Sequence, residues 1–120
     1  VIFHAAGASG LGVFDAAEEK KAYAIGCDSN QNDLKPGRVA TSMLKRVDTA
    51  VLNIIKQQAD EKFQPGTHYF GLKDNGIDYA VDANNEKIIE PYRARLESVR
   101  KKIEAREIKV PDYYEVSKGK

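Results

Sequence analysis

The fold is decided by residues 1–28, which read VIFHAAGASGLGVFDAAEEKKAYAIGCD. They begin with a short apolar run at 1–6, typical of a buried strand, and continue with a glycine-rich turn at 7–12. A helical pattern follows, and a second apolar run at 23–27 completes strand, turn, helix and strand in the length of one βαβ unit. Apolar strands without alternation favour a parallel sheet covered on both faces, so we expect these two strands to be parallel neighbours.

The first helix is recognised by the spacing of its apolar residues. Leu11, Phe14 and Ala17 recur three residues apart, and Ser9 precedes them as a candidate N-cap. Charged residues end the pattern near Lys21, so we expect a helix that packs one face against the sheet.

The middle of the chain continues to alternate between strand and helix patterns. We expect a third strand at 39–43, followed by a helix at 44–62 that carries an apolar stripe. The segments 68–72 and 77–81 predict two further strands, joined by an Asn75-Gly76 hairpin turn.

The last helix has the clearest pattern. Pro91 fits its first turn, and apolar residues then follow at spacings of four, three and four: Tyr92, Leu96, Val99 and Ile103. A polar tail at 113–120 ends the sequence. The expected order is therefore β-α-β-β-α-β-β-α, an α/β fold.

Composition excludes several classes of protein. A length of 120 residues suits one domain, and the lone Cys27 cannot form a disulfide within the chain. Nineteen Lys and Arg against eighteen Asp and Glu give a net charge of +1, which argues against a nucleic-acid partner. No apolar run approaches the roughly 18 residues that a membrane span needs.

Ligands of open α/β sheets bind beyond the carboxyl ends of the strands, so the turn that contains Gly7 is a candidate site. Its glycines follow the order G-x-x-G-x-G, which is neither the dinucleotide fingerprint nor a P-loop, so NAD or phosphate binding is weakly supported. Two interpretations stay open: a tight turn that needs positive φ, or a surface where a neutral small ligand approaches the backbone.

Two charged positions follow the next two strands. Asp28 stands at the end of the second strand, where its carboxylate accepts hydrogen bonds either from a vicinal diol or from the following turn. Lys45 and Arg46 stand at the expected start of the long helix, where the helix dipole opposes a cation. Either a ligand or a carboxylate such as Asp28 compensates them, or they are tolerated exposed charges.

Residues suited to catalysis are few. His4 and His68 are far apart, and neither has a partner at metal-ligand spacing. His4 either lines the crevice or is a satisfied buried side chain, and the second is favoured. We therefore expect no enzyme activity, no metal and no cofactor.

Five stretches resemble, in this order, the C-terminal part of the basic membrane lipoprotein family, the substrate-binding proteins of ABC transporters that are similar to purine nucleoside receptor lipoproteins. They are VIFHAAGASGLGVFDAA, YAIGCDSNQ, PGRVATSMLKRVDTAV, GTHYFGLKDNGIDYAVD and KKIEAREIKVPD. The resemblance covers Val1 to about Asp112 and implies a type I periplasmic-binding-protein fold. In that fold two Rossmann-like lobes, each a mostly parallel sheet with flanking helices, hold the ligand between them.

The resemblance also implies a function and a set of site residues. The ligand would be a purine nucleoside such as guanosine or inosine, delivered to an ABC permease after hinge closure without any bond made or broken. Gly7 would contact the ligand through its backbone, Asp28 would accept the ribose hydroxyls, and Lys45 would hydrogen-bond the ribose or base. Lys73 is the rival of Lys45.

Where the sequence departs from the family, it predicts an incomplete receptor. Family members are two to three times longer, and the chain begins without Met on a strand-like Val1-Ile2-Phe3. We therefore expect residues 1–112 to be the C-terminal portion of a two-lobed protein. The N-terminal remainder would carry the residues that stack on the base, and a lipid anchor outside this chain would hold the protein on the extracytoplasmic side of the membrane.

Overall fold

A four-stranded sheet forms the centre of the computed structural model, which describes residues 1–111. Its strands lie in chain order: β1 (Ile2–Phe3), β2 (Ala24–Gly26), β3 (Val39–Lys45) and β4 (Ile77–Tyr79). β1 pairs with β2 and β2 with β3 in parallel, whereas β4 runs antiparallel to β3. The expected α/β class with a mostly parallel sheet is confirmed.

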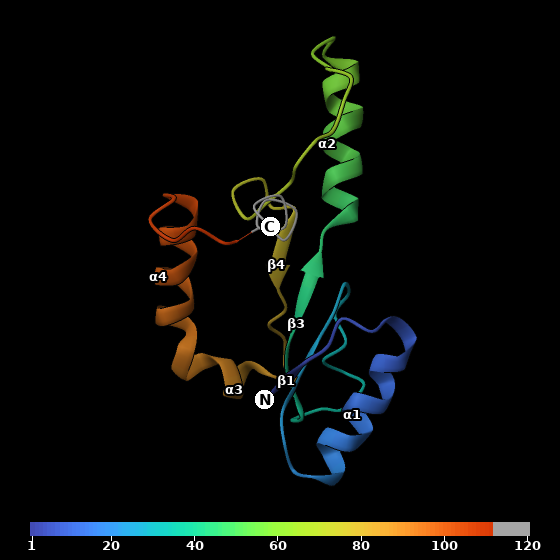
Figure 1. Cartoon of the computed structure of the whole chain (residues 1–120), viewed down its shortest axis with the longest axis vertical. Helices are drawn as coiled ribbons and strands as arrows, with labels where there is room; N and C mark the ends of the chain where they lie inside the picture. The colour runs from blue at the N-terminus through green and yellow to red at the C-terminus, as the bar shows by residue number, and fades with distance from the viewer. Residues whose placement is uncertain (112–120) are drawn as a thin grey trace, which may run out of the picture.

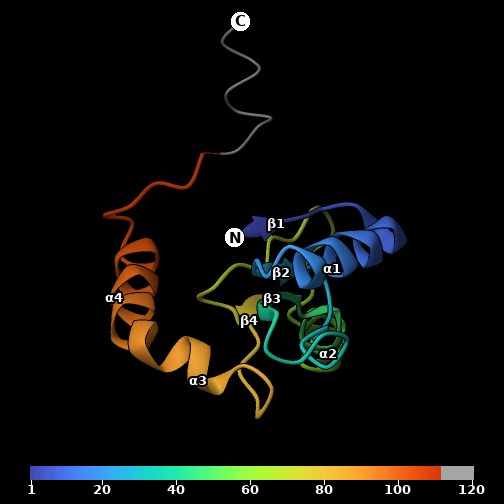
Figure 2. The same cartoon turned by 90° about the horizontal axis from the view of Figure 1, so that it is seen from below.

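The helices lie on both sides of this sheet. α1 covers one face, α3 and α4 form an arm on the opposite side (Figure 2), and α2 extends beyond the end of β3 (Figure 1). Their bounds are η1 (Gly7–Ser9), α1 (Gly10–Glu19), α2 (Val47–Ala59), α3 (Glu86–Ile89), η2 (Glu90–Tyr92) and α4 (Arg93–Glu104).

The main core lies between α1 and the two central strands. Phe14 and Ala17 of α1 pack with Ala24 of β2 and Val39 of β3, and each of these side chains is buried. This contact confirms the predicted βαβ unit. Leu11 shares their spacing but is exposed, so the buried face of α1 is narrower than predicted.

β1 is not the buried strand that its composition predicts. Ile2 is 49% exposed and Phe3 is 57% exposed. β1 has β2 as its one neighbour among the described strands, so its outer edge pairs with nothing within residues 1–111. Apolar composition predicted the strand itself, but burial depends on how many layers surround it.

The predicted strand at 68–72 is wrong. This segment is neither helix nor strand, and β4, predicted to return along it, pairs with β3 instead. The Asn75-Gly76 pair does not form a two-residue hairpin. The Gly76 N–H donates to the Gly71 carbonyl at 2.8 Å, and the Asn75 N–H donates to the Leu72 carbonyl at 3.1 Å. With Asn75 at a φ of 54°, this is the chain reversal of a Schellman motif, which usually ends a helix.

The first and second helices begin differently from the prediction. Ser9 precedes α1 but donates or accepts no side-chain capping hydrogen bond, because a 3-10 turn runs directly into the helix. α2 starts at Val47 instead of residue 44, because the preceding residues extend β3 to Lys45.

The C-terminal helix is confirmed, with an irregular beginning. Pro91 lies in the 3-10 turn η2, and regular α-helix starts at Arg93. A short helix, α3, precedes this turn in a segment for which the sequence predicted no element. The polar tail predicted at 113–120 lies outside the described residues.

Candidate functional site

The three parallel strands end at one edge of the sheet, and each leads into one predicted ligand residue. β1 ends at Phe3 and continues into the turn that holds Gly7, Asp28 comes two residues after β2, and Lys45 is the last residue of β3. The carboxyl ends of parallel strands are the edge at which open α/β sheets bind ligands. The structure therefore brings all three candidates to the expected edge.

Asp28 and Lys45 are joined through their backbones. The Lys45 N–H donates a hydrogen bond of 2.9 Å to the Asp28 carbonyl oxygen. Asp28 has a φ of 70°, in the left-handed region that Asp tolerates better than most residues. Both side chains are exposed, and within residues 1–111 neither charged group forms a hydrogen bond or an ion pair. The alternative that the Asp28 carboxylate caps its own turn is therefore wrong.

The cation at the start of α2 has a partner other than Asp28. Arg46, the residue before the helix, donates from Nη2 to Asp48 Oδ2 at 2.8 Å. This hydrogen bond lowers the pKa of Asp48 to about 2 and raises that of Arg46. Lys45 lies on the strand and not in the first helical turn, so the argument from the helix dipole does not apply to it.

Gly7 occupies the tight turn that the sequence predicted. Its φ is +53°, and a Cβ placed on it would meet nothing within 4 Å. The conformation, and not crowding, is what favours glycine here. The same open space leaves the Gly7 backbone accessible, so both interpretations of the turn are compatible with its geometry.

A partly buried hydrogen-bond network shapes the loop that follows β2. Gln31 Oε1 accepts from the Cys27 N–H at 2.9 Å, and Ser42 Oγ accepts from the Gln31 N–H at 3.0 Å. Ser42 Oγ in turn donates to Asn32 Oδ1 at 2.8 Å. A Cβ on Gly26 would lie 2.5 Å from Ser42 Oγ, so glycine is needed for this close approach.

Sequence reasoning missed this network, although the sequence holds a signal for it. Ser42 and Asn32 are completely buried. A serine inside the apolar third strand and a run of polar residues directly after the second strand are the pattern that such a network leaves.

His4 does not line the edge of the sheet. It is 7% exposed, and its ring meets Phe14 edge to face with the ring centroids 5.1 Å apart. Neither ring nitrogen has a hydrogen-bond partner within residues 1–111, so burial was predicted correctly and hydrogen bonding was not. A Cβ on Gly10 would overlap the His4 ring at Cε1. The ring fits in this position because residue 10 has no side chain.

Lys73 is exposed in the turn before β4, and its role remains a prediction. Within residues 1–111 no group of three or more His, Cys, Asp or Glu is placed to hold a metal ion. No helix in the same range has the length and apolar character needed to cross a bilayer.

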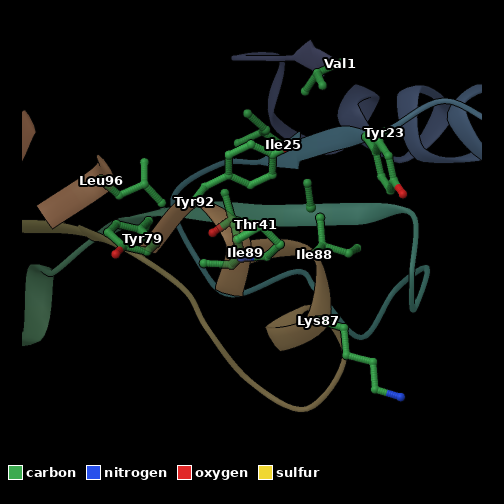
Figure 3. Close-up of a pocket in the computed structure, with 12 residues that line it drawn as sticks. Val1, Tyr23, Ile25, Thr41, Tyr79, Lys87, Ile88, Ile89, Tyr92 and Leu96 are labelled. Carbon is green, nitrogen blue, oxygen red and sulfur yellow. The ribbon is translucent and has the colours of Figure 1, made fainter. Parts of the chain in front are cut away.

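A separate cavity of about 630 Å³ lies between the sheet and the α3–α4 arm (Figure 3). Its wall is almost entirely apolar or aromatic, with Ile25 and Thr41 on the sheet side and Ile88, Tyr92 and Leu96 on the helical side. None of the three predicted ligand residues lines it. It is therefore an apolar cavity distinct from the polar edge of the sheet.

Comparison with known proteins assigns the chain to a family. Residues 1–113 match the family Bmp, described as ABC transporter substrate-binding protein PnrA-like. The chain belongs to this Bmp family. The resemblance identified from the five sequence stretches is thus confirmed.

Individual Bmp relatives agree with that assignment. The chain is 36% identical over 88 residues to Basic membrane protein D of Borreliella burgdorferi, covering 70% of this chain and 26% of the relative. It is 36% identical over 85 residues to an uncharacterized lipoprotein of Pyrococcus abyssi, covering 66% of this chain and 21% of that protein. The chain therefore spans about a quarter of the length of these relatives.

A solved structure supports the fold. An ABC transporter system solute-binding protein from Aeropyrum pernix superimposes with a TM-score of 0.65 at 25% identity, over 92% of this chain and 40% of that one. The family is described by substrate binding and not by catalysis. The likeness confirms the solute-binding-protein fold that the sequence predicted.

Proposed function

We propose that this chain is the C-terminal portion of a solute-binding protein that delivers a purine nucleoside to an ABC permease. The observation that carries the proposal is the Asp28 carboxylate, which stands exposed at the carboxyl end of β2 without a partner in the described chain. A carboxylate in that position is suited to accept hydrogen bonds from both hydroxyls of a ribose.

The two other residues complete the ribose end of the site. Lys45, held next to Asp28 by their backbone hydrogen bond, donates to the ribose or the base. Gly7 lets the ligand approach the backbone of the turn after β1. Lys73 remains the alternative donor to Lys45.

The rest of the receptor packs on the surfaces that are open here. Parallel sheets are normally covered on both faces, and the apolar cavity beside α3 and α4 is an uncovered part of one face. α2 has no buried residue and extends beyond the sheet. We assign both surfaces to contacts with the N-terminal remainder, and residues 1–112 to the C-terminal portion of a two-lobed protein.

Closure of the two lobes on the nucleoside is the proposed mechanism, with no bond made or broken. A lipid anchor outside this chain holds the receptor on the extracytoplasmic side of the membrane. The lipoprotein names of relatives support this location.

A ligand panel tests the proposal on the longest natural polypeptide that contains this sequence. Ligands that bind the folded state raise the melting temperature, so inosine and guanosine are compared with D-ribose and NAD. We expect stabilisation by the nucleosides at micromolar concentrations and none by NAD. Stabilisation by NAD alone would favour a dinucleotide-binding protein and refute the proposal.

A further inference from the structure

The carboxylate of Asp82 connects two loops that are far apart in the sequence. Asp82 Oδ2 accepts hydrogen bonds from Asn30 Nδ2 at 2.8 Å and from Asn32 Nδ2 at 3.0 Å. Asp82 Oδ1 accepts from the Asn84 N–H at 2.8 Å. One side chain after β4 therefore holds the loop that begins at Asp28.

Asp82 is itself held on a rigid base. Its N–H donates to Asn85 Oδ1 at 2.8 Å. The Asn85 amide, which is 1% exposed, donates from Nδ2 to the carbonyl of Ala40 at 2.9 Å and to that of Ala80 at 2.8 Å. These bonds connect the Asp82 turn to β3 and to the residue after β4. Asp82 is therefore held in place by the sheet, and the loop of residues 28–32 is bonded to it.

Asn32, at the loop end of the connection, is also held by the sheet. Asn32 is completely buried and uses its Oδ1 to accept from Ser42 of β3. The hydrogen bond from the Asn30 side chain is the largest cause that holds the pKa of Asp82 below its ordinary value, and the bond from the Asn84 N–H is the next. Asp82 is thus ionised near neutral pH, and its bonds to the two amides are charge-assisted.

The position of the Asp28 carboxylate depends on these anchors. No side chain within residues 1–111 forms a hydrogen bond or an ion pair with the carboxylate, so no such bond sets its direction apart from the backbone of its loop. The Lys45 N–H fixes the Asp28 carbonyl on one side, and Asp82 fixes Asn30 and Asn32 on the other. Between these anchors Asp28 adopts its left-handed φ of 70°.

We propose that Asp82 is a positioning residue, which holds the loop of residues 28–32 so that the Asp28 carboxylate faces the ribose hydroxyls. The role of Asp28 rests on the proposed function, whereas the connection from Asp82 to the loop stands on its own geometry. Asp82 itself does not contact the ligand.

Asp82→Asn tests the connection without a large change of volume. The new amino group either faces the amino groups of Asn30 and Asn32 or leaves the Asn84 N–H without its acceptor. Asp60→Asn makes the same change at the exposed end of α2, away from this network, and is the matched control. Asn30→Ala, at an exposed position, removes one of the two amide bonds to Asp82 together with the Oδ1 that accepts from the Asn32 N–H at 3.0 Å. It is the milder variant because the bond from Asn32 Nδ2 to Asp82 stays.

Hydrogen exchange measures the connection directly on the longest natural polypeptide that contains this sequence. We expect the amides of Cys27 and Gln31 to exchange roughly tenfold faster in Asp82→Asn, less so in Asn30→Ala, and at the wild-type rate in Asp60→Asn. Unchanged exchange in Asp82→Asn would overturn the connection, whether or not the protein binds nucleosides.

Binding to the longest natural polypeptide measures the positioning. For Asp82→Asn we expect a roughly tenfold weaker Kd for inosine, the size of one lost hydrogen bond, and an unchanged Kd for 2′,3′-dideoxyinosine, which has no diol for Asp28. Equal losses for both ligands would show general damage to the site and overturn the positioning role. If the wild-type protein does not bind inosine, the proposed function fails and the ligand role of Asp82 fails with it, while the exchange result still decides the connection.

Discussion

The Arg46–Asp48 pair gives a prediction about a single ionisable group. Asp48 has a pKa of about 2 in place of its ordinary 3.8, because Arg46 donates hydrogen bonds to its carboxylate. A lowered folded-state pKa means that Asp48 stabilises the fold above about pH 4, and that this contribution disappears as the pH falls through 2. Replacing Arg46 with Gln should return the Asp48 midpoint toward 3.8 in a carboxyl NMR titration.

Lys56→Gln is the control for that titration. It removes a cation from the last turn of the same helix and should leave the Asp48 midpoint unchanged. If Arg46→Gln and Lys56→Gln had the same effect, the low pKa would come from net charge and not from the paired side chain.

Two glycines of α1 provide a second prediction. A Cβ at position 10 would overlap the buried ring of His4, whereas a Cβ at position 12 would meet nothing within 4 Å. Gly10→Ala should therefore destabilise the chain by about 1–3 kcal/mol through overpacking. Gly12→Ala should be neutral or stabilising by about 0.5 kcal/mol, because alanine favours the helix.

Urea unfolding of the two alanine variants checks this difference. Equal midpoints would mean that the His4 ring moves away at little cost, and that Gly10 is not required for its burial.

At the same scale, sequence reasoning found the ligand candidates more readily than their support. The position of Asp28 follows from one local rule, because the end of a short apolar strand is visible in the sequence. The bonds to Asp82 link residues 50 and 52 positions apart, and no local pattern specifies such a pairing. Lys45 was placed at the correct edge but on the wrong element.

Among the elements, α1 and α2 show why an apolar stripe does not by itself predict burial. Both carry apolar residues at helical spacing, yet Phe14 is 1% exposed in α1 and Val51 is 52% exposed in α2. α1 connects the parallel strands β1 and β2 and lies across the face of the sheet. α2 leaves the end of β3 and extends away from it (Figure 1).

This contrast predicts that shortening a side chain to alanine destabilises the 120-residue chain strongly in α1 and little in α2. Phe14→Ala should cost about 3–5 kcal/mol, the usual cost of emptying a buried aromatic site. Val51→Ala should change the free energy of unfolding by less than about 0.5 kcal/mol. A large loss from Val51→Ala, measured by urea unfolding, would mean that α2 packs against something in solution.

The pairing of β4 marks the limit of sequence reasoning about elements. The Asn75-Gly76 dipeptide indicated a chain reversal, and the chain does reverse there. Which strand β4 joins depends on β3 extending to Lys45, a competition between distant segments that turn chemistry cannot decide. The βαβ unit was predictable because its glycine turn, helix and second strand lie within 28 consecutive residues.

In the whole molecule, the polar edge that carries the candidate ligand residues lies beside large apolar surfaces. Asp28, Lys45 and Gly7 share the carboxyl end of the parallel strands, while β1, α2 and the cavity beside α4 expose apolar side chains. Exposed apolar surface of this extent is typical of a surface that packs against further protein. The proposed function assigns the polar edge to the ligand and the apolar surfaces to the remainder of the receptor.

Isothermal titration of inosine into the longest natural polypeptide that contains this sequence tests the ribose role of Asp28 directly, with the wild-type protein and Asp28→Ala measured side by side. If the carboxylate accepts both ribose hydroxyls, we expect micromolar or tighter binding by the wild type and a loss of roughly a hundredfold in Asp28→Ala, about 3 kcal/mol. Equal affinities of the two proteins for inosine would contradict this role of the Asp28 carboxylate.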